Sequence, residues 1–175
     1  DRVVALMGGS VKGKTIAILG LTFKPNTDDM RDSPSLSIVA VLQGSGARIK
    51  AFDPAGMAEA KKLLPDIAYC DDAYGAIDGA DAIRMIPEAR PDVVLLDMRM
   101  PGLSGLDVLR ELAGRDALPP TIILTTFDDD ELVLAGIQSG ARGYLLKDVA
   151  LADLVNAIKT VAEGGSIVKP AVTQR

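Results

Sequence analysis

The segment Pro91–Gly105 constrains the fold of this chain more than any other. Its apolar run Val93–Leu96 includes two β-branched residues and ends in a single carboxylate, Asp97, shortly before a Met-Pro-Gly turn. A continuous apolar run of this length is typical of a strand that is buried on both faces, as the strands of a parallel sheet are. Open α/β sheets place their ligand crevices at the carboxyl ends of their strands. Asp97 is therefore predicted to lie at a functional edge of a sheet.

Strand and helix patterns alternate along the whole chain. Six runs are predicted to be strands: Lys14–Leu21, Arg48–Phe52, Ile67–Cys70, Val93–Asp97, Thr121–Thr125 and Gly143–Leu146. Helices are predicted from Ser33-Pro34 to Gly44, at Gly56–Leu64, Asp72–Ala89 and Gly105–Ala113, after a cap at Asp128, and from Asp148 to Glu163. This alternation predicts an α/β fold, a three-layer, doubly wound, Rossmann-like parallel sheet of six strands in the order 3-2-1-4-5-6.

Composition excludes several classes of function. The 175 residues carry a net charge of −5, whereas a domain that binds nucleic acid usually presents a basic face. Histidine is absent, and the one cysteine, Cys70, cannot form an internal disulfide or a zinc cage. No apolar run approaches the roughly 20 residues of a membrane helix. We therefore expect a cytoplasmic protein with neither a nucleic acid nor a membrane as its partner.

The run GKTIAILGLTFKPNTDDMRDSPSL at Gly13–Leu36 is long and specific. Together with AFDP at Ala51–Pro54, it resembles the C-terminal, UDP-binding domain of the UDP-glucose and GDP-mannose dehydrogenase family. The resemblance covers residues 1 to about 82. It implies that Lys24 contacts a nucleotide sugar and that Arg31 reaches the NAD side. Cys70 does not match the catalytic cysteine of that family, and Asp53 is interpreted as a turn residue because no G-x-G-x-x-G run precedes it.

Residues from about 87 to 175 carry a second set of matching points: Asp97, Thr125 at the end of the next strand, and Lys147 in GYLLK. They resemble the second half of a bacterial response-regulator receiver domain. The resemblance implies that Asp97 is phosphorylated and that the hydroxyl and the lysine bind phosphoryl oxygens. Receivers also hold Mg²⁺ with an acidic pair after their first strand, where this chain has Gly20-Leu21. The facing loop carries Asp28, Asp29 and Asp32 as possible replacement ligands.

The two resemblances meet at a junction that we place at residues 83–90, and they predict one domain made of two half-folds. We therefore interpret the chain as an engineered chimera, a structural scaffold that is not an enzyme. No cofactor is expected unless the phosphosite survives and takes Mg²⁺, and no partner is expected beyond a weak homodimer. The alternatives are a receiver-like phosphoacceptor switch at Asp97 and a residual module that binds a nucleotide sugar.

Overall fold

A single six-stranded parallel sheet forms the centre of the molecule. The computed structural model describes residues 11–19, 21, 30, 33–53, 57–69, 79–100, 103–125 and 130–167. The strands are β1 (Thr15–Leu19), β2 (Arg48–Phe52), β3 (Ala68–Tyr69), β4 (Val93–Asp97), β5 (Thr121–Thr125) and β6 (Gly143–Leu146). Their order is β3-β2-β1-β4-β5-β6, which confirms the predicted topology. Four of the six strands begin and end at the predicted residues.

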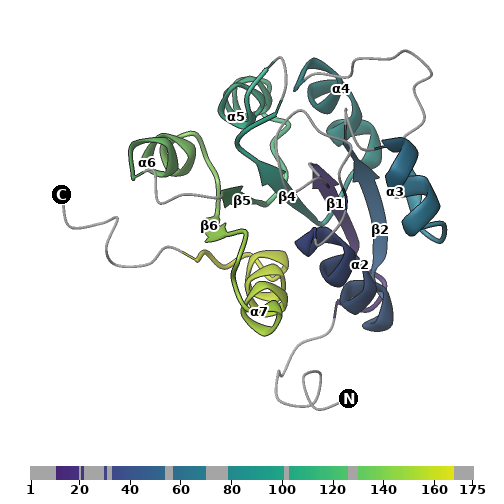
Figure 1. Ribbon diagram of the computed structural model, residues 1–175. Helices are drawn as coiled ribbons and strands as arrows, with labels where there is room; N and C mark the ends of the chain where they lie inside the picture. The colour runs from purple at the N-terminus through teal and green to yellow at the C-terminus, as the bar shows by residue number, and fades with distance from the viewer. Residues whose placement is uncertain are drawn as a thin grey trace.

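Helices cover both faces of the sheet. They are α2 (Pro34–Gly44), α3 (Met57–Leu63), α4 (Gly79–Ala89), α5 (Gly105–Gly114), α6 (Asp130–Gln138) and α7 (Leu151–Ala162). Figure 1 shows α4 and α5 on one side of the sheet and α2 and α7 on the other. Each side has its own apolar cluster, so the three-layer α/β architecture follows directly from burial on both faces of the strands.

The seam between β1 and β4 joins the two predicted halves of the chain. The two strands pair in parallel from Ile16 opposite Val93 to Leu19 opposite Leu96. At its start, Asp92 accepts a hydrogen bond from the backbone N–H of Thr15 at 2.8 Å and lies 3.3 Å from the ammonium of Lys14. The hydrogen bond from the Thr15 amide, followed by the contribution of Lys14, lowers the pKa of Asp92. Backbone pairing between β1 and β4 therefore joins the two halves, and the hydrogen bond from Thr15 to Asp92 adds to it at the start of the strands.

Packing across the seam is continuous on the α2 and α7 side. Val39 and Leu42 of α2 belong to the same buried cluster as Ile158 and Val161 of α7. All four side chains are less than 1% exposed. Because one cluster takes side chains from both predicted halves, the two halves bury their apolar surface together rather than as separate cores.

The helix starts match the sequence in two places and differ in one. Ser33 caps α2, with Pro34 in the first turn, and Ser104 and Asp107 form the predicted capping box of α5. Asp148, predicted to open the last helix, instead lies in a turn in which Val149 N–H donates to the carbonyl of Leu146. The helix begins at Leu151, after an Ala150 that makes no side-chain cap.

Two expectations extend beyond the described residues. The predicted helix Asp72–Ala89 is described only as α4, Gly79–Ala89, which contains Pro87. The predicted cap at Asp128 lies outside the described part of the chain. Among the described residues, no helix is both long and apolar enough to cross a membrane.

Candidate functional site

An ion pair links the ends of two strands at the carboxyl edge of the sheet. Asp97 is the last residue of β4, and Lys147 follows the last residue of β6, with β5 between them. The Nζ of Lys147 donates a hydrogen bond to Oδ2 of Asp97 at 2.6 Å. The two side chains are only 11% and 12% exposed. The structure thus brings together two of the three residues predicted for this edge, although they are 50 positions apart.

Thr125, the third predicted residue, ends the strand between them. It is 3% exposed, and its register partner is Leu146, the residue before Lys147. The backbone N–H of Lys147 donates to the carbonyl of Thr125 at 2.8 Å. This hydrogen bond fixes the backbone of Lys147 against the end of β5. The three residues therefore end or follow three adjacent strands at one edge of the sheet.

The chain after Asp97 is held in a tight return. Oδ1 of Asp97 accepts a hydrogen bond from the backbone N–H of Arg99 at 3.0 Å. Gly105, the first residue of α5, comes so close that a Cβ there would lie 2.4 Å from the Asp97 carbonyl oxygen and 2.9 Å from Met98 Cα. These are backbone atoms, so only glycine fits. The sequence predicts Gly105 only as the first residue of a helix, because the close approach of α5 to the end of β4 leaves no local pattern.

The position of the receiver acidic pair carries different chemistry here. Leu21 is fully buried, and its backbone N–H donates to Oδ2 of Asp53 at 2.6 Å. Asp53, interpreted from the sequence as a turn residue, is itself 2% exposed and ties the chain after β1 to the end of β2. Within the described ranges there is no group of three or more acidic, cysteine or histidine side chains that could hold a metal ion. The described residues therefore do not fit a receiver-type Mg²⁺ site.

The remaining predicted residues lie outside the described part of the chain. Lys24 and Arg31 are predicted to contact a nucleotide sugar and the NAD side. The other residues are the three aspartates of the same loop, Asp28, Asp29 and Asp32, and Cys70.

Comparison with known proteins gives two kinds of similarity. The family model for the response regulator receiver domain matches residues 53–159. The uncharacterized transcriptional regulatory protein YxjL of Bacillus subtilis (strain 168) is 45% identical over 92 residues, which are 51% of this chain and 41% of that protein. UDP-glucose 6-dehydrogenase of Rhizobium meliloti (strain 1021) is 51% identical over 87 residues, which are 50% of this chain and 20% of the enzyme.

A solved structure supports the fold. The receiver domain of the Francisella response regulator 1452 superposes with a TM-score of 0.61 at 20% identity, covering 87% of this chain and 98% of that domain. At this identity the likeness concerns the fold alone. The chain spans about a fifth of the dehydrogenase and about two fifths of the regulator.

Proposed function

The chain belongs to the response regulator receiver domain family, whose model covers residues 53–159, and on this premise we propose that Asp97 is a phosphoacceptor. The observation that carries the proposal is the ion pair between Asp97 and Lys147 at the carboxyl edge of the sheet. A carboxylate is a suitable nucleophile for phosphoryl transfer, and an adjacent ammonium neutralises the charge that the phosphoryl oxygens bring. The phosphoryl group stays on the protein, so the proposal involves no catalytic turnover.

The transfer from a small phosphodonor such as acetyl phosphate is a displacement at phosphorus. One carboxylate oxygen of Asp97 forms the new O–P bond, while the bond from phosphorus to the acetyl oxygen breaks and acetate leaves with the electron pair. Lys147 stays protonated and moves its hydrogen bond from the carboxylate to a phosphoryl oxygen. Thr125, at the end of β5, supplies a hydroxyl donor from the same edge.

The replacement of the acidic pair by Gly20-Leu21 makes this site slower than a complete receiver. Two negatively charged groups, the Asp97 carboxylate and the phosphodonor, must approach each other without Mg²⁺, and within the described part of the chain the ammonium paired with Asp97 is that of Lys147. We therefore propose slow, small-molecule phosphorylation rather than rapid exchange with a kinase.

Beryllofluoride, a non-covalent mimic of an aspartyl phosphate, tests the site without requiring transfer. A ligand that binds only the folded state must raise the midpoint of a thermal melt. We expect beryllofluoride to raise the midpoint of the wild type and to leave that of Asp97→Asn unchanged. Asp92→Asn, which removes a carboxylate from the opposite end of β4, serves as the matched control and should still respond. An unchanged midpoint in the wild type would refute the proposal.

We also propose that the chain is a chimera of two half-folds. Two observations support this: relatives of two different kinds each match about half of the chain, and the acidic pair is lost where the first half replaces that of a receiver. On this proposal, the chain is a cytoplasmic scaffold that tests whether complementary fragments can share one core. A chimera with one core should unfold in a single transition, with coincident curves from probes placed in each half. Two separated transitions would contradict it.

A residual nucleotide-sugar site is the remaining proposal from the dehydrogenase resemblance. UDP-glucose should then raise the melting midpoint of the wild type but not that of Lys24→Ala. If neither UDP-glucose nor beryllofluoride moves the midpoint, the scaffold proposal alone remains.

A further inference from the structure

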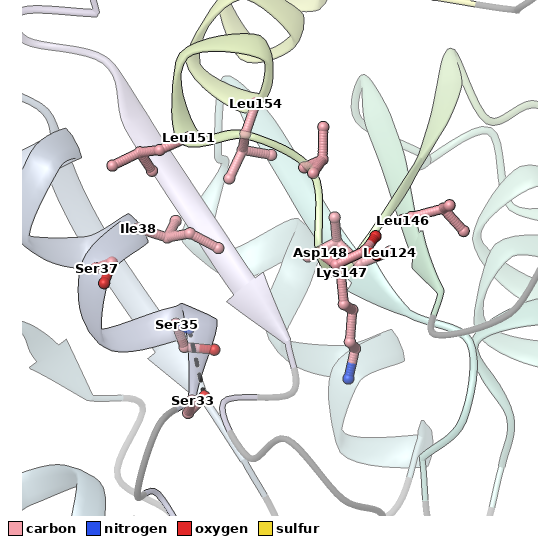
Figure 2. A pocket seen from close by; sticks show the side chains of 11 residues that line it. Ser33, Ser35, Ser37, Ile38, Leu124, Leu146, Lys147, Asp148, Leu151 and Leu154 are labelled. Carbon is pink, nitrogen blue, oxygen red and sulfur yellow. Dashed lines mark hydrogen bonds between the residues drawn. The ribbon is translucent and has the colours of Figure 1, made fainter.

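A cavity of about 260 Å³ opens between the start of α2 and the segment that joins β6 to α7. Figure 2 shows its lining side chains, which come from three separate parts of the sequence: residues 33–38, Leu124 and residues 146–154. Ser33, Ser35 and Ile38 form one wall, and Lys147, Val149 and Leu151 form part of the other. The first wall belongs to the half that resembles dehydrogenases and the second to the half that resembles receivers. The cavity therefore exists only where the two halves meet.

One polar group in this cavity is without a protein partner. Ser35 is 9% exposed and lines the cavity, and within the described residues its hydroxyl makes no hydrogen bond. Its neighbour Ser33 differs, because the Ser33 hydroxyl donates to the carbonyl of Leu21 at 2.5 Å and accepts from the backbone N–H of Ser35. In Figure 2 the Ser35 oxygen points from α2 toward the side on which Lys147 lies. Among the described residues no fully buried side-chain oxygen or nitrogen lacks a hydrogen-bond partner, so the Ser35 hydroxyl is open to the cavity and can bond a ligand that lies there.

The charges around the cavity disfavour an anion. Lys147 is the one ammonium among the described lining residues, and the carboxylate of Asp97 already neutralises it at 2.6 Å. Asp148, a second carboxylate, also lines the cavity. The remaining wall is largely apolar and includes Ile38, Leu151 and Leu154. An uncharged ligand avoids the repulsion that these carboxylates would exert on a negative group.

We propose that this cavity binds a small uncharged molecule that has an apolar body and one carbonyl or hydroxyl oxygen. The hydroxyl of Ser35 bonds that oxygen, and the side chains of Ile38, Leu151 and Leu154 surround the body. The size fits, since an engineered cavity of about 150 Å³ accommodates benzene. A volume of about 260 Å³ leaves room for a ring and a short polar substituent. The site is separate from the phosphoacceptor proposal, because it requires neither phosphate nor an altered Asp97.

Acetophenone, an aromatic ring with one carbonyl, is the probe, and the ¹H–¹⁵N spectrum of the full chain is the readout. For a ligand of this size we expect a Kd on the order of 1 mM. Saturable shifts should concentrate in the amides of residues 33–38 and 146–154. Ser35→Ala should weaken binding about fivefold, the usual effect of one neutral hydrogen bond. Because the Ser35 hydroxyl bonds nothing else in the described structure, this variant should fold normally. Ser45→Ala, at the other end of α2, should bind like the wild type.

Three results would overturn the proposal. The first is the absence of saturable shifts in those two segments at about 10 mM acetophenone, roughly ten times the expected Kd. The second is equal affinity in the wild type and Ser35→Ala. The third concerns charge: benzoate, with the same ring and a carboxylate, should bind more weakly than acetophenone. Equal or tighter binding of benzoate would overturn the assignment of an uncharged ligand.

Discussion

Removing the ammonium of Lys147 should destabilise the fold, because it leaves the carboxylate of Asp97 unpaired in a site that is largely buried from solvent. The Asp97 side chain is 12% exposed, and without the ammonium it keeps one described backbone hydrogen bond, from Arg99. Breaking a buried ion pair from one side costs about 3–5 kcal/mol. Since both side chains retain some contact with solvent, we expect about 3 kcal/mol for Lys147→Met. We expect less for Asp97→Asn, because a lysine can extend its ammonium toward water.

A double-mutant cycle separates the ion pair from other effects. Combining Lys147→Met with Asp97→Asn should cost less than the sum of the two changes, with a coupling free energy of about 2 kcal/mol. The assay is urea unfolding followed by far-ultraviolet circular dichroism. The pair between Lys14 and Asp92, 39% and 36% exposed, provides the control. The same cycle there should give less than about 1 kcal/mol. Additive effects at Asp97 and Lys147 would refute the reasoning.

Two further predictions concern Gly105 and Asp92. Gly105→Ala should cost about 2 kcal/mol in urea unfolding, because its Cβ would collide with the backbone of Asp97 and Met98. Gly114→Ala, at the other end of α5 with no atom within 4 Å of the new Cβ, should lose no stability, and equal losses at both sites would contradict the packing argument. The pKa of Asp92 is lower in the folded than in the unfolded protein. The ionised carboxylate therefore stabilises the fold at pH values above its unfolded-state pKa, near 3.9, and this stabilisation is lost as the pH falls through the folded-state pKa. Asp92→Asn should therefore have a lower free energy of unfolding than the wild type at neutral pH, and this difference should disappear below about pH 4. A difference that does not change with pH would contradict the lowered pKa of Asp92.

The order of the sheet could be predicted from the sequence because the signals are local and repeated. The runs Val93–Leu96 and Ile122–Leu124 are continuously apolar, and a polar residue, Asp97 or Thr125, follows each of them, so they identify buried strands and their ends. Six strand–helix alternations then leave few arrangements once crossovers are right-handed. The start of α7 could not be predicted in this way, because Asp148 is as good a helix cap as any aspartate. Only the turn from Leu146 to Val149 shows that the chain bends there instead.

The candidate site was predictable in part. Asp97 and Lys147 could be placed at one edge by the strand order, and their ion pair follows from that placement. The need for glycine at position 105 could not be predicted from the sequence, because it depends on how closely α5 approaches the end of β4. The cavity beside Ser35 was not predictable either, because its walls come from segments that are far apart in the sequence, at residues 33–38, Leu124 and residues 146–154. Contacts between distant segments leave no periodic signal in the sequence.

Covalent transfer to Asp97 is the most direct test of the central claim. The protein is incubated with acetyl phosphate, and the intact mass is measured, followed by peptide mapping to locate the modification. We predict slow gain of one phosphoryl group in the wild type, with the modification on Asp97, and no gain in Asp97→Asn. No gain in the wild type, or the same gain in both proteins, would contradict the assignment of Asp97 as a phosphoacceptor.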